Sequence, residues 1–255
     1  MIRMDLLAAS IKEKLWHKLR QDLQAYIPEI NETNLLMCCV CGRRLSYDDF
    51  SLEHIIPQQA LADDPTEIKS NPETTANARS GVILLCRKRL LIKGRIHNNG
   101  CNGWKGRFYD SHLRELLNGR ILENKHHKPS DQHIIAALCA SYLAMVLKFG
   151  YQVALTPSGV LMKRQFFNPH KFHRNLPLRH QIILAAPPPK YDEEDFRIWS
   201  NPFNFTIEGN ACYVGFRTMS LILPISRDPR VPMSVSLLIA PQKYKLRPDF
   251  RAAFD

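Results

Sequence analysis

The stretch Ser51-Leu52-Glu53-His54-Ile55-Ile56-Pro57 places an acid beside a histidine at the end of an apolar, strand-like run. Neighbouring side chains on a strand point to opposite faces, so the strand must end or bend here if both are to serve one site. Pro57 suits such an end, because proline cannot donate to a β-ladder. A carboxylate beside an imidazole can place a divalent ion close to a base that activates water.

Cysteines with the spacing of metal ligands flank this stretch on both sides. Cys38 and Cys41 are separated by two residues, which is the spacing of a zinc knuckle. Downstream, fourteen residues separate Cys86 from Cys101. We therefore predict a structural Zn²⁺ site. The long second loop leaves His97 and Cys39 as alternatives for the fourth ligand.

The distribution of charge favours an anionic partner. The chain of 255 residues has a formal net charge of +11, and between Arg79 and Arg107 it has eight Lys or Arg and no Asp or Glu. A basic stretch that overlaps the cysteines favours nucleic acid over a membrane surface. The residues predicted to contact nucleic acid are Lys105, Arg107, Arg87, Lys88 and Arg89.

The cysteine usage and the apolar runs bear on the compartment. Seven cysteines is an odd number, and four of them have metal-like positions rather than those of a disulfide framework. The N-terminus lacks the pattern of a secretory signal. The longest apolar run, 134–147, is shorter than the ~20 residues that span a bilayer. We expect a cytoplasmic protein that does not enter a membrane.

We predict an α+β fold with three segments. Residues 1–34 form an N-terminal helical segment, with an amphipathic helix over 2–27 that Pro28 ends. Residues 35–122 form a zinc-containing unit, and residues 123–255 form a C-terminal α+β domain of unknown role that offers a surface for a homodimer or a partner protein.

Within the middle segment, two short strands over 51–54 and 81–86 and a helix from Asn102 to Asn118, stopped by Gly119, form a β-β-α unit. After a polar linker over 123–129, the apolar stretch 131–149 predicts a buried helix capped by Gly150. The strand-like runs of the C-terminal part are 151–155, 181–186, 205–208, 211–216, 219–224 and 234–240.

These residue types suit the hydrolysis of a phosphodiester. Glu53 offers a carboxylate and Asn102 an amide oxygen to a hard divalent ion, Mg²⁺ or Mn²⁺. As a neutral imidazole, His54 can take the proton from water near pH 7. The first turn of the helix at Asn102 offers free amides that attract phosphate.

The order Cys-x-x-Cys, then Glu53-His54-Ile55-Ile56-Pro57, then Cys101-Asn102-Gly103-Trp104-Lys105-Gly106 resembles the HNH endonuclease family, in its zinc-stapled ββα-metal branch. The resemblance covers residues 38–118. It implies a ββα-metal nuclease domain with a zinc knuckle that cleaves nucleic acid, with double-stranded DNA preferred.

The resemblance also assigns roles to residues. It implies that His54 is the general base and that Glu53 and Asn102 hold the catalytic ion. It also implies that Asp110 helps to position these ligands without binding the ion itself. The structural Zn²⁺ ligands that it implies are Cys38, Cys41, Cys86 and Cys101.

Three departures from the family pattern stand out. The family's middle asparagine usually falls near Gly81, and here the nearest candidate is Asn77. The glycine pair that commonly follows the proline is missing, and the loop between Cys86 and Cys101 is expanded. The alternative interpretation is a non-catalytic, zinc-containing module that binds nucleic acid, and a third is a scaffold that acts through the C-terminal domain.

Overall fold

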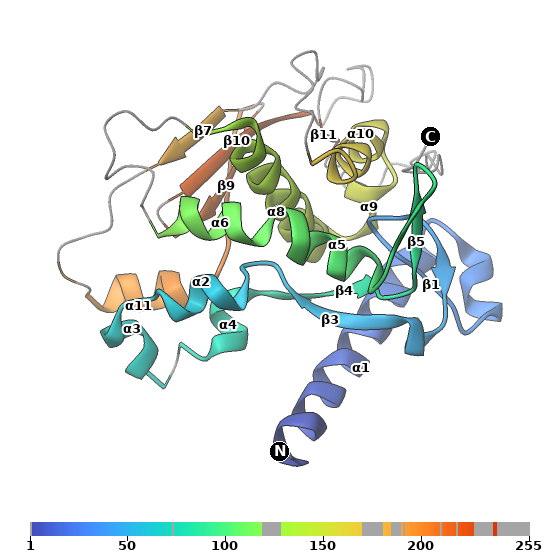
Figure 1. Cartoon of the computed structure of the whole chain (residues 1–255), viewed down its shortest axis with the longest axis horizontal. Helices are drawn as coiled ribbons and strands as arrows, with labels where there is room; N and C mark the ends of the chain where they lie inside the picture. The colour runs from blue at the N-terminus through green and yellow to red at the C-terminus, as the bar shows by residue number, and fades with distance from the viewer. Residues whose placement is uncertain are drawn as a thin grey trace.

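The computed structural model describes residues 2–72, 74–118, 129–169, 181–184, 190, 192–209, 211–217, 219–226 and 237–238. Its fold is α+β, as predicted, with helices surrounding small and mostly antiparallel sheets (Figure 1). The longer helices are α1 (Ile2–Gln24), α5 (Gly100–Phe108), α6 (Asp110–Leu117), α8 (Asp131–Phe149), α10 (Pro157–Phe166) and α11 (Glu193–Ser200). The short helices are η1 (Pro28–Glu32), η2 (Tyr47–Asp49), α2 (Gln58–Ala62), α3 (Thr66–Ser70), α4 (Ala76–Ser80) and α9 (Tyr151–Ala154).

Three two-stranded ribbons form the sheet structure of the first half. β1 (Leu36–Met37) pairs with β2 (Arg44–Leu45), and β3 (Phe50–His54) pairs antiparallel with β4 (Val82–Cys86). The third ribbon joins β5 (Leu90–Ile92) and β6 (Arg95–His97). The strands predicted over 51–54 and 81–86 are therefore present, and they are neighbours in one ribbon.

The helix predicted from Asn102 to Asn118 is two helices, which corrects the prediction. α5 begins at Gly100 and α6 follows directly after Tyr109, whose φ of −124° lies outside the helical range. The hydroxyl of Tyr109 donates to the carbonyl oxygen of Phe166, so burial of this ring against α10 outweighs helix continuity. Gly119, the predicted stop, lies outside the described residues.

The predicted strand over 151–155 is also wrong, because this stretch forms α9. Gly150 has a φ of +78°, which ends α8 and redirects the chain. The backbone N–H of Tyr151 then donates to the carboxylate of Asp22, and its hydroxyl donates to the carbonyl oxygen of Met37. These long-range bonds fix a helical turn where the residue pattern alone favours a strand.

The C-terminal sheet confirms most of the other predicted strands. β8 (Asn204–Glu208), β9 (Ala211–Phe216) and β10 (Met219–Ser226) are antiparallel, and β7 (Gln181–Leu184) also pairs with β10. β11 (Leu237–Leu238) runs parallel to β10. The linker predicted over 123–129 lies outside the described residues except for Pro129.

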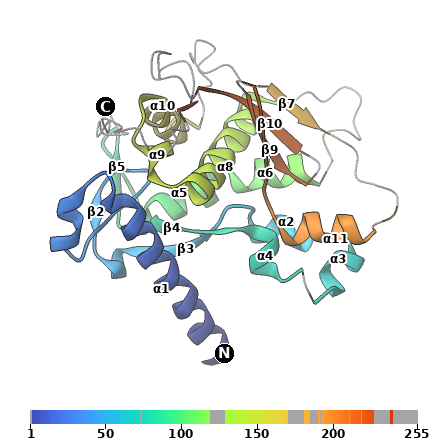
Figure 2. The same ribbon diagram turned by 180° about the vertical axis from the view of Figure 1, so that it is seen from behind.

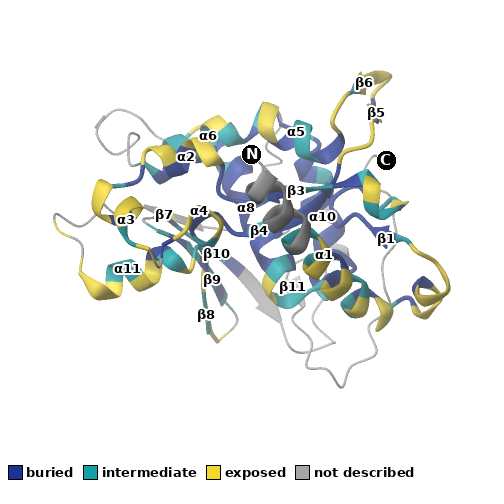
Figure 3. Cartoon of the chain, turned by 90° about the horizontal axis from the view of Figure 1, so that it is seen from below, coloured by how far each residue is buried: buried dark blue, intermediate teal, exposed yellow. Residues whose placement is uncertain are grey.

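One hydrophobic cluster joins all three predicted segments. Its members include Trp16 of α1, Leu85 of β4, Leu143 of α8 and Leu221 of β10. α8 contacts both β4 and β10 and lies between the β3–β4 ribbon and the C-terminal sheet (Figures 1 and 2). The buried positions run through the middle of the molecule (Figure 3).

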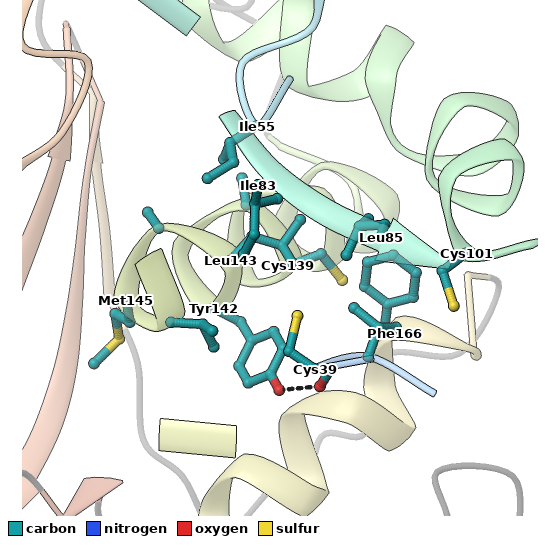
Figure 4. Packing of buried hydrophobic residues seen from close by; sticks show 14 of the residues in the cluster. Cys39, Ile55, Ile83, Leu85, Cys101, Cys139, Tyr142, Leu143, Met145 and Phe166 are labelled. Carbon is teal, nitrogen blue, oxygen red and sulfur yellow. Dashed lines mark hydrogen bonds between the residues drawn. The ribbon is translucent and has the colours of Figure 1, made fainter. Parts of the chain in front are cut away.

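The predicted burial of α8 is confirmed. α8 is long and apolar enough to cross a membrane by composition, but 67% of its most apolar window is buried inside this fold. The close-up in Figure 4 shows why, since Leu143 and Cys139 of α8 lie beside Ile83 and Leu85 of β4, while Tyr142 lies beside Cys39.

Candidate functional site

Three of the predicted zinc ligands lie close together. The sulfur atoms of Cys38, Cys41 and Cys101 all lie within 4.8 Å of one another, and all three residues are buried. Cys38 and Cys41 come from the turn between β1 and β2, and Cys101 from the first turn of α5. In the folded chain, Cys38 and Cys41 therefore lie next to Cys101, which is far from them in sequence.

The fourth predicted ligand, Cys86, lies at the end of β4 beside this group. Its thiol hydrogen-bonds with those of Cys101 and Cys41. The bond with Cys101 lowers the pKa of Cys86 and the bond with Cys41 raises it, and with burial the net change is upward. The guanidinium of Arg43 donates to the sulfur of Cys86 at 3.0 Å and to that of Cys41 at 3.5 Å. A cation that donates to two sulfurs favours their thiolate forms.

The electrostatics of the cluster suit a bound cation. Burial raises the pKa of Cys38 and of Cys101 well above the ordinary range of a thiol. Hydrogen bonds from Cys101, Cys38 and Cys86 instead lower the pKa of Cys41. The protein alone thus favours one thiolate among four buried sulfurs. Tetrahedral Zn²⁺ binds four thiolates and deprotonates coordinating thiols, so this donor set fits zinc.

The two alternative ligands lie elsewhere. Cys39 packs into the core beside Tyr142, whose hydroxyl donates to the Cys39 carbonyl oxygen (Figure 4). Burial raises the pKa of the Cys39 thiol to about 12, as it also raises those of Cys38 and Cys101, so the position of Cys39 and not its pKa sets it apart. His97 stacks edge-on against Trp104, with the ring centroids 4.5 Å apart. Cys86 is therefore the better fourth ligand.

His54, the predicted base, faces α4. Its Nε2 lies 3.3 Å from Oδ1 of Asn77. An amide oxygen can only accept, so the imidazole makes this bond in the tautomer that carries its proton on Nε2, and in that tautomer Nδ1 has a lone pair that can accept a proton. Asn77, the residue nearest in sequence to the family's middle asparagine, is thus positioned to orient the histidine.

Glu53 lies on the other side of β3 and faces α5. The pairing of β3 with β4 stays regular through His54, so the strand does not bend here, and the expected turn of both side chains toward one site is not seen. Its Oε1 is 2.8 Å from Nζ of Lys105, which also lies 2.6 Å from Oδ1 of Asp110 and donates to the carbonyl oxygen of His54. Burial raises the pKa of Glu53, and Lys105 only partly offsets this. Burial by itself would lower the pKa of Lys105, but the charges of Glu53 and Asp110 outweigh it and raise this pKa.

Asn102 fixes α5 against β3 through its side-chain amide. Its Nδ2 donates to the hydroxyl of Ser51 at 2.9 Å and to the carbonyl oxygen of Leu52 at 3.3 Å. These two bonds leave the amide oxygen of Asn102 as its ligand atom. They also bring Asn102 to the strand that carries Glu53, on the face to which Lys105 points.

Lys105 does not lie where we predicted it. Only 2% of the residue is exposed, and its ammonium group is held between two carboxylates, so it is not a surface contact for phosphate. The spacing of the motif cannot distinguish a buried lysine from an exposed one. Arg107, Arg87, Lys88 and Arg89 are exposed, with Lys88 3.1 Å from a carboxylate oxygen of Asp49.

The expanded loop between Cys86 and Cys101 forms the β5–β6 ribbon, which extends outward from the molecule (Figure 3). Leu91 and Ile96 are paired across it and are 67% and 64% exposed. Arg43 donates to the carbonyl oxygens of Lys88 and Arg89 at the base of the ribbon. The guanidinium that lies against the cysteines therefore also anchors this basic ribbon.

Sequence reasoning missed a buried ion cluster behind α4. The carboxylate of Asp64 pairs with Arg79 of α4 and, at 2.6 Å, with Arg217 between β9 and β10. The guanidinium of Arg217 also lies 4.4 Å from the ring centroid of Trp199. No spacing rule connects Asp64 to Arg217, because they are far apart in the chain. Through Arg79, this cluster ties the C-terminal sheet to the helix that carries Asn77.

Replacement of Asp64 by Asn is expected to lower the free energy of unfolding by about 3 to 5 kcal/mol, because it leaves two buried guanidinium groups without their charge partner. Urea unfolding followed by circular dichroism measures the change. Asp63→Asn is the matched control, since it removes a more exposed pair with Arg114 and should cost less than about 1 kcal/mol. Equal losses in the two variants would contradict the role of the buried cluster.

A second contact joins the C-terminal part to the end of α4. Gly81 has a φ of +62°, and a Cβ at this position would lie 2.3 Å from the ring of Phe203. A cavity of about 330 Å³ lies beside this contact, lined by residues of α4, α8 and the segment 201–205. α4 and the residue after it therefore contact the C-terminal part on one side, and α4 contacts His54, through Asn77, on the other.

Comparison with known proteins adds no relative from which a role could be carried over. No family model matches the chain, and no curated protein or solved structure matches it.

Proposed function

We propose that this protein is a metal-dependent endonuclease of the HNH type, in which residues 35–122 form a zinc-stapled ββα-metal domain. The observation that carries the proposal is the contact of His54, at the end of β3, with Asn77 of α4. Glu53 and Ser51 of the same strand face α5, where they contact Lys105 and Asn102. An imidazole with one nitrogen held and the other free is the arrangement that a general base needs. DNA is the preferred substrate on the family resemblance.

Each residue has a distinct task in this proposal. Nδ1 of His54 takes the proton of the attacking water, while Asn77 holds the ring in place. Glu53 and Asn102 would hold the Mg²⁺ or Mn²⁺ ion, which when bound neutralises the phosphoryl oxygens and helps the leaving oxygen. Lys105 and Asp110 hold the Glu53 carboxylate in position.

The proposed substrate surface lies over the exposed basic residues. Arg87, Arg89 and Arg107 are close in sequence to the zinc ligands Cys86 and Cys101, so a strand bound there would pass beside α5. Their positive charge would attract phosphate, and the projecting β5–β6 ribbon has dimensions that a groove of DNA admits.

Incubation of the purified protein with supercoiled plasmid tests the proposal. We expect nicked and then linear DNA with Mg²⁺ or Mn²⁺ and intact plasmid with EDTA. A parallel single-stranded RNA substrate tests the preference for DNA. Intact plasmid with every divalent ion, from protein that contains its zinc, would contradict the proposal.

One contact favours the second candidate, a non-catalytic module that binds nucleic acid. The Lys105 ammonium group already neutralises the Glu53 carboxylate, and such a pair lowers the affinity for an added cation. The module predicts binding that weakens steeply with salt and no nicking with any divalent ion. The plasmid experiment therefore separates the two candidates.

Arg87 and Arg89 are expected to contact phosphates in either case. The double variant Arg87→Gln with Arg89→Gln should reduce the slope of log K against log salt by about 2, because each lost phosphate contact removes about one unit. Fluorescence anisotropy with a labelled duplex in EDTA measures the slope.

The matched control removes the same charge at the opposite end of the molecule. Lys69 of α3 and Arg197 of α11 are exposed and lie far from the β5–β6 ribbon (Figures 1 and 3). The double variant Lys69→Gln with Arg197→Gln should keep a slope close to that of the wild type. An equal fall in both double variants would mean that net charge alone drives binding, and that the ribbon has no special role.

A further inference from the structure

A second group of metal-binding side chains lies where α6 meets α8. His112 and Glu115 are three residues apart on α6, so they share a face of that helix, and His133 lies in the first turn of α8. One ligand atom from each of the three lies within 4.8 Å of those of the other two. None of these residues belongs to the cysteine cluster or to the site around Glu53.

The hydrogen bonds of His133 leave it aimed at Glu115. Its Nδ1 accepts from the backbone N–H of Ser130 at 3.2 Å and lies 2.6 Å from the Ser130 hydroxyl, so that it caps α8. Its Nε2 lies 2.8 Å from Oε2 of Glu115. Only 9% of His133 is exposed. In a metal site, a histidine binds the ion through one ring nitrogen and donates its other N–H to an outer oxygen. With an ion in place of the proton on Nε2, the Ser130 hydroxyl is the oxygen that would accept from Nδ1–H.

His112 supplies the second observation. Its Nδ1 is buried and has no hydrogen-bond partner among the residues that the structure describes. Its ring lies edge-on to that of His133, with the centroids 5.0 Å apart. A buried ring nitrogen without a partner costs free energy, and coordination to an ion in the space beside His133 and Glu115 would remove that cost.

We propose that His112, Glu115 and His133 bind one Zn²⁺ ion that ties α6 to α8. Two imidazoles and one carboxylate form a three-ligand set that zinc accepts, with water in the fourth position. Mg²⁺ is disfavoured because it prefers an all-oxygen shell. The proposal does not depend on the nuclease activity.

The position of the ion gives it a structural role. α6 is the last described helix of the segment 35–122, and α8 is the first described helix of the C-terminal part. The two helices pack against each other, and α8 also contacts β4 and β10. An ion between them would fix the C-terminal part to the unit that contains Glu53 and His54.

Zinc content and cobalt spectra of the full chain test this site. We expect the wild type to bind two zinc ions per chain and His112→Ala to bind one. Glu115→Gln is the conservative second variant, because it keeps a side chain of the same shape and removes only the anionic ligand. It should also lose one ion, while the exposed His17→Ala should lose none.

Substitution with Co²⁺ identifies which ion is lost. Cobalt bound by thiolates has an intense sulfur-to-metal charge-transfer band, and cobalt bound by nitrogen and oxygen does not. His112→Ala and Glu115→Gln should keep this band and bind one Co²⁺ fewer. Unchanged metal content in both folded variants would overturn the proposal and leave His133 as a hydrogen-bonded helix cap only. A second ion that persists in every variant is bound non-specifically and would also overturn it.

Discussion

A Cys41→Ser variant is expected to contain one zinc ion fewer per chain than the wild type and to be largely unfolded at room temperature. Binding of zinc to structural sites contributes roughly 10 to 16 kcal/mol, which is comparable with or greater than the ~5 to 15 kcal/mol net stability of a protein. Cys41 is the sulfur whose pKa is lowered by its cysteine neighbours, so its loss removes the most readily formed thiolate of the cluster. Mass spectrometry of the metal content and circular dichroism measure the two effects.

Cys39→Ala is the matched control for this experiment. Cys39 is a neighbour of Cys38 and is equally buried, but its thiol packs into the core beside Tyr142 (Figure 4). The variant should lose some packing energy and keep all of its zinc. If Cys41→Ser kept its zinc and its stability, or if Cys39→Ala lost zinc, the assignment of the cluster would be wrong.

A His54→Ala variant is expected to lose plasmid cleavage by a factor of at least ~10² with Mg²⁺ or Mn²⁺, since a positioned general base typically contributes ~10² to 10⁴. The fold should be retained, because His54 is only partly buried and its side chain touches Asn77 at the surface. Rates of nicking under single-turnover conditions measure the loss. Zinc content and the thermal midpoint should match those of the wild type.

Two further variants make this result specific. Asn77→Ala should slow cleavage less than His54→Ala does, because it removes the partner that orients the ring but leaves the base in place. His17→Ala, an exposed histidine of α1, should cleave at the wild-type rate. Cleavage by His54→Ala at the wild-type rate would refute His54 as the base. A loss that is equal in the His17 variant would point to a general effect of the substitutions.

Much of the local structure could be predicted from local patterns. The apolar stretch of α8 is buried on nearly all sides, and Gly150 ends it as predicted. The short strands around Glu53 and Cys86 also form, and they pair with each other. These elements depend on neighbours a few residues away, which is the range over which hydrophobic periodicity and helix caps act.

Short or interrupted patterns were interpreted wrongly for a physical reason. The five residues from Tyr151 to Leu155 suit a strand by composition, but bonds from Tyr151 to Asp22 and Met37 select a helical turn. In the same way, burial of Tyr109 against Phe166 divides the predicted helix into α5 and α6. Long-range hydrogen bonds decide such cases, since intrinsic propensities differ by less than the energy of one buried contact.

The residue types at the candidate site were determined by the sequence itself: an acid and a histidine at a strand end, four spaced cysteines and a basic stretch. Their neighbours were decided only by the tertiary structure. It buries Lys105 between Glu53 and Asp110, brings Asn77 to His54, and joins Asp64 to Arg217. A sequence motif specifies which groups are present, whereas their charge state and orientation depend on partners that only the folded chain brings together.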